Sequence, residues 1–323
     1  MIIWVTGCAG FIGTNICKYY LKQGHEVVGF DNLSRSGSEK NLEVLKGYKR
    51  FMFVMANVES LLTKAIGTLM TAPEPTVIFH MAAQVGVTKS IENPLYDFGA
   101  NILGSLAVLE YARTCKKKPI VIYASTNKVY GDIQVNQPVS EETPLNFHTP
   151  YGVSKGAADQ YMLDYHRIYG VPTVVFRQSC IYGPYQHGAE EQGWIDHFIK
   201  SVAFGDGKLN FYGDGTQVRD VLYVDDLIAL YDLAVKNIDK AQGQAFNTGG
   251  GVENVLSLNE AIKIIGEESG NQAKITYRDW RPSDQKYYVS DISKAKEMLG
   301  WAPTVDPRKG IVQSIEHSEV AYA

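Results

Sequence analysis

The chain has 323 residues, of which 45% are apolar and 20% are charged, and its net charge is −4. This composition excludes a disordered chain, and the interspersed charges indicate neither a nucleic-acid groove nor a basic membrane surface. Its four cysteines show no CxxC or framework spacing, and no signal-type apolar run precedes the first expected strand. We therefore expect reduced thiols in a cytoplasmic protein without a membrane span.

Short β-branched runs alternate with amphipathic stretches along the first half of the chain. The runs predicted to be strands are Ile2–Thr6, Glu26–Phe30, Arg50–Val54, Thr76–Phe79, Ile120–Tyr123 and Thr173–Arg177. Helices are expected at Phe11–Gln23, Pro94–Thr114 and Pro150–Tyr169. Apolar strands joined by helices predict an α/β fold with a doubly wound parallel sheet, that is, a Rossmann fold covered on both faces.

The pattern changes after about residue 178. Glycine and tyrosine become frequent, and helices such as Asn259–Ser269 are separated by long loops. We predict a Rossmann domain of residues 1–178 plus about 222–250, where the chain returns to the sheet. Residues of about 179–221 and 251–323 are expected to form a smaller α/β lobe.

Three glycines spaced GxxGxxG join the first strand to the first helix, at Gly7, Gly10 and Gly13. Without a Cβ, such a turn lets a pyrophosphate approach the helix N-terminus, where unpaired N–H groups favour negative charge. The glycine motif is weak evidence by itself, but its position between a strand and a helix indicates a dinucleotide site.

Asp31 stands at the end of the second strand, where a carboxylate can accept hydrogen bonds from the adenosine ribose. It would repel a 2′-phosphate, so NAD is favoured over NADP. Two alternatives stay open: Asp31 is a plain turn residue, or the nearby Arg35 holds a 2′-phosphate.

Tyr151 and Lys155 are four residues apart and share one face of a predicted helix. A free phenol has a pKa near 10, so a base active near neutral pH needs its phenolate stabilised, by an ammonium and a cationic nicotinamide. Thr126 follows a predicted central strand, where its hydroxyl can orient a sugar hydroxyl and share its proton with Tyr151. The predicted catalytic set is Thr126, Tyr151 and Lys155; the alternative is a Tyr–Lys pair on the surface.

The chain resembles the extended short-chain dehydrogenase/reductase family of NAD-dependent nucleotide-sugar epimerases and dehydratases over nearly its whole length. The motifs that carry the resemblance are the glycine loop, Asp31–Leu33, His80–Ala83, Asn101, Ser125–Gly131, Tyr151 with Lys155, Arg177 with Tyr182–Pro184, Arg219–Asp220, Asn247–Gly250, and Arg281 with Asp284. The resemblance implies that the first domain binds NAD and the smaller lobe binds a nucleotide sugar.

The resemblance also implies sets of contact residues. The residues expected at NAD are Gly7, Gly10, Phe11, Ile12, Gly13, Asp31, Asn32, Ser34, Arg35, Asn57, Val58, Ala82, Ala83, Asn101, Tyr151 and Lys155. Those expected at the substrate are Gln84, Thr126, Asn127, Cys180, Gln192, Gly193, Trp194, Arg219, Arg281 and Asp284. Two departures stand out, because many relatives carry an acidic residue at Asn57–Val58 and UDP-sugar relatives commonly carry Asn in place of Cys180.

Arginine forks match phosphate oxygens, and the alternative for a single arginine is a solvated surface charge. The resemblance implies that Arg219 and Arg281 hold the diphosphate. Asp284 is expected at the substrate ribose, and Gln192–Trp194 at the base. Core packing is the alternative for Trp194.

The pair Asn127–Lys128 stands where 4,6-dehydratases carry an Asp–Glu acid and base. An amide and an ammonium cannot serve in those roles, so the pair argues against dehydration. Residues 125–131, 146–162 and 192–194 most resemble 2-epimerases of CDP-linked hexoses such as CDP-paratose and CDP-tyvelose, or CDP-glucose-like sugars. That resemblance implies a transient 2-keto sugar. A UDP-sugar 4-epimerase, another nucleotide-sugar oxidoreductase and a non-catalytic NAD-binding scaffold stay open as alternatives.

The histidines show no metal-ligand spacing with one another or with the cysteines, so no metal is expected. Apolar stripes run along the predicted helices Pro94–Thr114 and Pro150–Tyr169. They are read as core packing or as a four-helix interface in a homodimer or homotetramer.

Overall fold

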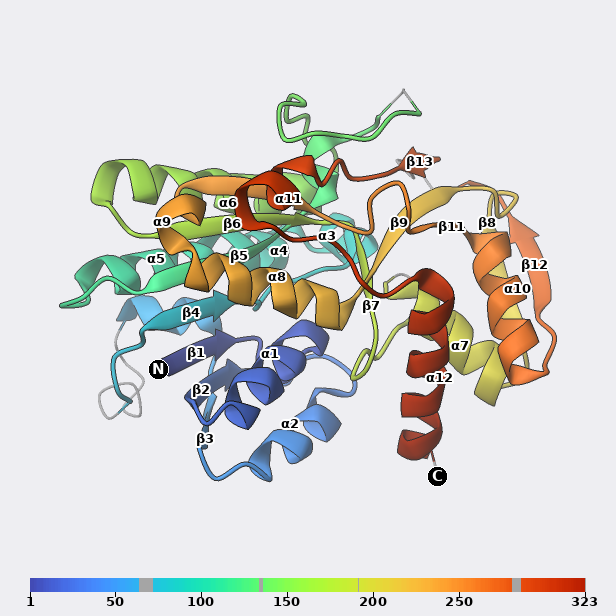
Figure 1. Ribbon diagram of the computed structural model, residues 1–323, viewed down its shortest axis with the longest axis horizontal. Helices are drawn as coiled ribbons and strands as arrows, with labels where there is room; N and C mark the ends of the chain where they lie inside the picture. The colour runs from blue at the N-terminus through green and yellow to red at the C-terminus, as the bar shows by residue number, and fades with distance from the viewer. Residues whose placement is uncertain (64–71, 134–135, 191, 281–285, 323) are drawn as a thin grey trace.

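A computed structural model describes residues 1–63, 72–133, 136–190, 192–280 and 286–322, with side chains up to residue 319. Seven parallel strands form its largest sheet, in the order β10-β6-β5-β4-β1-β2-β3 (Figure 1). They are β1 (Ile2–Thr6), β2 (Glu26–Asp31), β3 (Phe51–Met55), β4 (Val77–His80), β5 (Ile120–Thr126), β6 (Thr173–Gln178) and β10 (Gln244–Thr248). The strand order reverses between β1 and β4, as in a doubly wound fold, so this fold class is confirmed.

Helices cover both faces of this sheet. The helices that alternate with its strands are α1 (Phe11–Lys22), α2 (Ser38–Lys46), η1 (Val58–Thr63), α5 (Gly104–Thr114), α6 (Thr149–Tyr169), α8 (Val224–Lys236) and α9 (Ile238–Ala241). Alternate residues of β1 face opposite sides, since Ile3 and Val5 belong to one buried cluster and Trp4 to another. This period-two pattern explains why each strand is apolar throughout.

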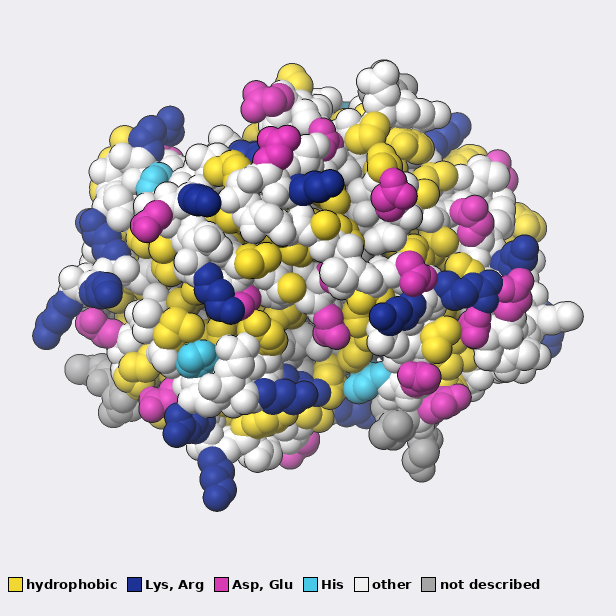
Figure 2. All heavy atoms as spheres, in the orientation of Figure 1, with side chains coloured by type: hydrophobic (Ala, Val, Ile, Leu, Met, Phe, Trp, Pro, Cys, Tyr) yellow, Lys and Arg dark blue, Asp and Glu magenta, His cyan; other side chains and the backbone are white. Residues whose placement is uncertain are grey.

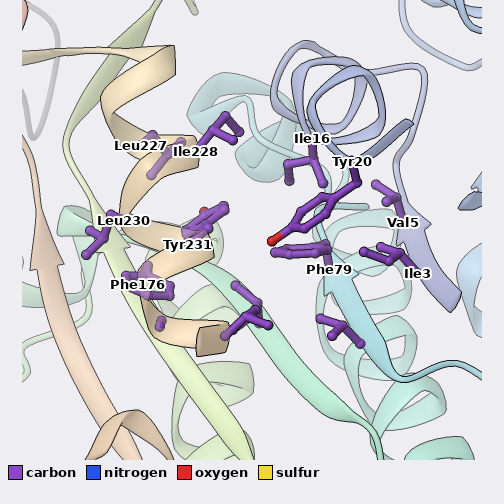
Figure 3. Close-up of a cluster of buried hydrophobic side chains, with 14 of the residues drawn as sticks. Ile3, Val5, Ile16, Tyr20, Phe79, Phe176, Leu227, Ile228, Leu230 and Tyr231 are labelled. Carbon is purple, nitrogen blue, oxygen red and sulfur yellow. The ribbon is translucent and has the colours of Figure 1, made fainter. Parts of the chain in front are cut away.

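Aliphatic and aromatic side chains pack together in the cluster between the sheet and helices α1 and α8 (Figure 3). The rings of Tyr20 and Phe79 have centroids 5.2 Å apart, and those of Phe176 and Tyr231 are 4.8 Å apart. Both distances lie in the favourable range for ring pairs. The cluster therefore joins β4, β6, α1 and α8 into one rigid unit below the carboxyl ends of the strands.

The predicted single helix Pro94–Thr114 is wrong in detail. The structure divides it into α4 (Pro94–Phe98), the π-helical turn η3 (Gly99–Leu103) and α5, and a short helix α3 (Val87–Glu92) precedes it. π-Helical turns occur often at functional sites, because they displace one side chain from the regular helical face. Here the displaced segment contains Asn101, one of the predicted site residues.

Smaller sheets lie beyond the main one, on the right of Figure 1. One combines β7 (Cys180–Tyr182), β9 (Val218–Tyr223), β11 (Val255–Ser257) and β13 (Tyr287–Tyr288), and the other pairs β8 (Lys208–Tyr212) with β12 (Lys274–Arg278). The remaining helices are η4 (Asn127–Tyr130), α7 (Trp194–Phe204), α10 (Leu258–Ser269), α11 (Ser293–Leu299) and α12 (Pro307–Tyr322). A separate buried cluster unites α7, α10, α12 and β8.

The division of the chain into two domains stays a prediction. β10 joins the main sheet beside β6, and α8 packs on that sheet, as the expected return of the chain requires. Helix α11 comes from the range expected for the smaller lobe. Its Ala295 and Leu299, with the following Trp301, nevertheless lie in the cluster of the main sheet.

Charged side chains of both signs are interspersed on the face of the molecule that Figure 2 shows. Among the helices of the described residues, none is long and apolar enough to cross a membrane.

Candidate functional site

A large cavity of about 1310 Å³ lies at the carboxyl ends of the main sheet. Its walls come from the loops after β1, β2, β4, β5 and β6 on one side, and from β8, β9 and the start of α7 on the other. Ligands bind in open α/β sheets at this edge, where the strand order reverses.

The structure brings almost all predicted site residues together around this cavity. Gln84 and Asn101 are the exceptions among the described residues, because they lie behind the wall. Arg281 and Asp284 fall outside the described residues. The assignment of individual contacts to cofactor or substrate stays a prediction.

The glycine loop shows why glycine is needed at two positions. Gly7 has a φ of 69°, in the left-handed region, and a Cβ there would lie 2.7 Å from the backbone nitrogen of Ala82. A Cβ on Gly13 would lie 2.0 Å from the carbonyl oxygen of Gly7. Helix α1 begins at Phe11 without a side-chain cap, which leaves its first N–H groups available to an anion. This cradle fits the pyrophosphate of a dinucleotide.

Asp31 lies in the cavity and also shapes its wall. The N–H of Ala9 donates to its Oδ2 at 3.0 Å, and the N–H of Leu33 donates to its Oδ1 at 2.8 Å. Burial raises the pKa of Asp31, against the opposing effect of these hydrogen bonds and of Arg35. A carboxylate has about four acceptor sites, so two backbone bonds leave capacity for ribose hydroxyls.

Two side-chain contacts close the far end of the dinucleotide cradle. Asn32 Nδ2 donates to Asn57 Oδ1 at 2.8 Å, which fixes the amide that replaces the acidic residue of many relatives. Arg35 donates across the cavity to Gln192 Oε1 and so links the main sheet to the opposite wall.

Thr126 and Ser125 end the same strand but have different partners. The Ser125 hydroxyl donates to Asp159 Oδ2 at 2.8 Å, below the cavity, where Asp159 pairs with Arg177. The Thr126 hydroxyl accepts from the N–H of Lys128 at 3.2 Å and lies close enough to Tyr151 to lower the pKa of the phenol. The structure therefore places the hydroxyl of Thr126, rather than that of Ser125, against the predicted base.

Burial is the largest cause of the pKa shifts of Tyr151 and Lys155. It raises the pKa of Tyr151 to about 12, although Thr126 and Arg35 act in the opposite direction. Burial also lowers the pKa of Lys155 to about 7, against the opposing charges of Asp97 and Asp159. The lysine Nζ lies 4.4 Å from the centroid of the Tyr123 ring. Without bound NAD, Tyr151 is therefore a neutral phenol. The expected stabilisation of its phenolate by an ammonium together with a cationic nicotinamide stays a prediction.

Gln84 and Asn101 form a buried amide pair. The N–H of Gln84 donates to Asn101 Oδ1 at 2.8 Å, and Asn101 Nδ2 donates to the carbonyl oxygen of Gln84 at 3.0 Å. Asn101 Nδ2 also lies 2.9 Å from Ser154 Oγ on α6. Both residues support the reactive helix from behind, a role that spacing in the sequence did not indicate.

The opposite wall carries the predicted substrate residues. Trp194 Nε1 donates to Cys180 Sγ at 3.4 Å, and the Trp194 ring also packs against Phe198. Trp194 thus lines the cavity and also packs against the core of this region. Its expected contact with the base stays a prediction. Arg219 is 9% exposed and lines the same wall, with Nη1 donating to the carbonyl oxygen of Val218.

Several cavity residues were not assigned to the site from the sequence, among them Lys128, Glu190, Asn210, Tyr212 and Gln217. Asn210 and Tyr212 alternate along β8 with the buried Leu209 and Phe211. This alternation in the sequence could have predicted that Asn210 and Tyr212 face away from the core. Tyr212 donates to Glu190 Oε1 at 2.6 Å, a contact that no spacing predicts.

Among the described residues, no group of three His, Cys, Asp or Glu side chains could hold a metal ion. The expectation of a metal-free site stays a prediction.

Comparisons with known proteins agree with this site. The family described as GDP-mannose 4,6 dehydratase matches residues 4–313. A CDP-paratose 2-epimerase of Salmonella typhi is 41% identical, with 96% of this chain and 97% of that protein covered.

Two solved structures match over nearly the full length of both chains. A UDP-glucose 4-epimerase of Thermotoga maritima, solved with UDP-glucose, has a TM-score of 0.89 at 31% identity and covers 100% of each chain. A UDP-glucose 4-epimerase of Thermus thermophilus, solved with NAD, has a TM-score of 0.86 at 30% identity and covers 99% of this chain and 100% of that one. The chain belongs to the GDP-mannose 4,6 dehydratase family, the nucleotide-sugar epimerases and dehydratases of the extended short-chain dehydrogenase/reductase group.

Proposed function

We propose that this enzyme epimerises a CDP-linked hexose at C2, with NAD as its cofactor, through a transient 2-keto sugar. The observation that carries the proposal is the set Thr126, Tyr151 and Lys155 at the cavity beside Asn127 and Lys128. The first three residues suit oxidation of a carbinol, and the last two lack the carboxyl groups that dehydration would need. The 41% identity to a CDP-paratose 2-epimerase supports the choice of nucleotide and carbon.

Tyr151 is the proposed base. The hydroxyl of Thr126 lies close enough to lower the pKa of Tyr151, and a sugar hydroxyl placed between the two can lose its proton to the phenolate. Bound NAD accepts the hydride from the carbinol carbon and later returns it to the opposite face of the keto sugar. As the hydride returns, the oxygen on C2 takes its proton back from Tyr151. The cycle therefore ends without net oxidation or reduction.

The pKa of Tyr151 must fall when the ligands bind, because the protein alone holds it at about 12. The guanidinium of Arg35 already acts to lower this pKa. The ammonium of Lys155, one helical turn from Tyr151 on α6, would add to that effect when protonated. Exclusion of water from the closed cavity strengthens such charge effects.

Arg219 is proposed to hold the diphosphate from the opposite wall, together with Arg281. Asp284 is proposed at the substrate ribose, and Gln192, Gly193 and Trp194 at the base. The polar residues of β8 and Glu190 belong to the same end of the cavity and are available to the nucleotide.

The experiment is incubation of the purified enzyme with CDP-hexoses and UDP-hexoses, with the inverted carbon located by NMR. We expect inversion at C2 of a CDP-hexose, NAD that copurifies and no accumulation of NADH. Inversion at C4 of a UDP-sugar would replace the proposal by the activity named for the two Thermotoga and Thermus relatives. Stoichiometric loss of reduced cofactor would indicate a net oxidoreductase.

A non-catalytic NAD-binding scaffold makes a different prediction, namely NAD binding without turnover of any sugar. The buried Lys155 argues against it, since burial of an ammonium is costly and a scaffold has no use for it.

A self-association surface is part of the proposal. Apolar side chains of α4 and α6 are exposed, including Leu95 at 81% and Val153 at 48%. These helices pack side by side, so an isologous contact would bring together four helices. Sedimentation or light scattering should show a dimer or tetramer; a monomer at micromolar concentration would reject it.

A further inference from the structure

A buried carboxylate without a cationic partner lies directly behind the reactive helix. Asp97, on α4, is 1% exposed. Its Oδ1 accepts hydrogen bonds from Gln84 Nε2 at 2.9 Å and from Asn101 Nδ2 at 3.2 Å. Across the described part of the chain, no Lys, Arg or His lies within ion-pairing distance of it. A lone carboxylate is costly to bury, so its position calls for a functional reason.

The hydrogen bonds of Asp97 lead to the turn of α6 that carries the reactive pair. Asn101 Nδ2 also contacts Ser154 Oγ, and that hydroxyl donates to the carbonyl oxygen of Tyr151 at 3.2 Å. Ser154 stands between Tyr151 and Lys155 in the sequence. Asn101 lies in the π-helical turn η3, and its side chain makes this chain of contacts from there.

The other titratable groups around Lys155 offset the charge of its ammonium less well than Asp97 does. Asp159, on α6, already pairs with Arg177 through two hydrogen bonds. His80, on β4, is neutral because burial lowers its pKa to about 3. Tyr123, on β5, presents its ring face, and Tyr151 is a neutral phenol in the protein alone. Asp97 is the largest of the charges that raise the pKa of Lys155 against its burial.

We propose that Asp97 is a positioning residue, whose buried charge keeps the ammonium of Lys155 protonated and whose hydrogen bonds through Asn101 hold the reactive turn of α6. The negative charge acts on both members of the pair, since it also disfavours the phenolate of Tyr151. Asp97 thus moves the pH range in which Tyr151 and Lys155 are active to higher pH, where Lys155 would be neutral without this charge.

The test rests on the proposed function and uses Asp97→Asn, which keeps the oxygen acceptor and removes the charge. In the pH profile of kcat, the rising limb reports loss of the first proton from the Tyr151–Lys155 pair and the falling limb loss of the second. We expect both limbs to move to lower pH by about one unit. Asp232→Asn is the matched control, because Asp232 is a buried carboxylate on α8 that pairs with Lys236. It should leave both limbs in place.

A second readout does not depend on turnover. The pKa of Lys155 can be followed by NMR of ¹³C-labelled lysine, assigned with Lys155→Met. It should fall in Asp97→Asn and stay near the wild-type value in Asp97→Glu. A fall in this pKa in a protein that turns over no sugar would support the role of Asp97 and reject the proposed function alone.

Two results would overturn the inference. One is a loss of rate in Asp97→Asn with both limbs and the pKa of Lys155 unchanged, which indicates a structural role. The other is failure of Asp97→Asn and Asp97→Ser to fold while Asp97→Glu folds, which means that the charge serves the fold rather than Lys155.

Discussion

The two walls of the cavity are built in different ways. The wall at the main sheet is shaped by backbone, with Gly7 and Gly13 in close contact with neighbouring main chain and the N-terminus of α1 aimed at the site. The opposite wall is shaped by side chains, such as Cys180, Trp194, Arg219 and Tyr212, that come from separate elements. A backbone cradle binds a constant chemical group, whereas side chains can be exchanged to choose a substrate. This difference agrees with the proposal that the wall at the main sheet holds the cofactor and the opposite wall holds the substrate.

The largest effect is expected at Tyr151, where the two walls meet. Tyr151→Phe should lower kcat by about a thousandfold, because general base catalysis is worth roughly that factor. NAD should stay bound, since the phenol is not part of the backbone cradle. The matched control is Tyr161→Phe on the exposed part of the same helix. Turnover within tenfold of the wild type would remove Tyr151 from the mechanism.

In the wall at the main sheet, Gly13 should not tolerate replacement by a residue with a Cβ. In Gly13→Ala, the new Cβ would meet the carbonyl oxygen of Gly7 at 2.0 Å, and the contact cannot be relieved by a side-chain rotation. We expect a loss of about 3 kcal/mol in the free energy of unfolding and loss of copurified NAD. Gly47→Ala is the control, because Gly47 does not line the cavity and its Cβ would meet only the carbonyl oxygen of Val44, at 3.4 Å. Denaturant titration and cofactor absorbance give the two measurements.

Lys155 connects the site to pH-dependent stability. Its pKa in the folded protein is about 7, below its ordinary value of 10.5, so the unfolded chain binds more protons between these limits. The free energy of unfolding should therefore rise with pH from about 7 to 10, by roughly 1.4 kcal/mol per pH unit from this group. Comparison with Lys155→Met isolates the contribution. Parallel pH profiles for the two proteins would show that the lysine keeps its ordinary pKa.

The side-chain wall should respond in affinity rather than in chemistry. Arg219→Met removes a charge proposed for the diphosphate and should raise KM about tenfold, with kcat changed much less. Arg308→Met on α12 is the control, because Arg308 pairs with Glu267 at the surface and does not line the cavity. An equal fall in kcat and kcat/KM would mean that Arg219 acts on the transition state instead.

Much of the main-sheet wall could be predicted. The β-branched strands, the glycine spacing and Asp31 are local signals, because sterics and hydrogen bonding within a few residues dictate them. The bounds of the predicted strands in the main sheet differ from the observed ones by at most three residues. The helix expected at Pro94–Thr114 is interrupted by η3, the π-helical turn that contains Asn101. Local helix propensity does not predict such a turn.

The roles of Gln84 and Asp97 could not be predicted. Gln84 was expected at the substrate, yet its amide pairs with Asn101 and Asp97 inside the protein. Asp97 carried no motif, and only the packing of α4 against α6 places its charge near Lys155. The same applies to Glu190, whose partner Tyr212 lies on another element.

The amino-acid sequence by itself determined the doubly wound sheet and the glycine turn after its first strand, and it predicted the set Thr126, Tyr151 and Lys155. These features rest on periodicity, on missing Cβ atoms and on residue types at the ends of strands. Only the tertiary structure decided which side chains face the cavity, which support it from behind and how burial shifts the pKa of Tyr151 and Lys155. The reason is that desolvation and charge act through space, between elements whose distance along the chain carries no such information.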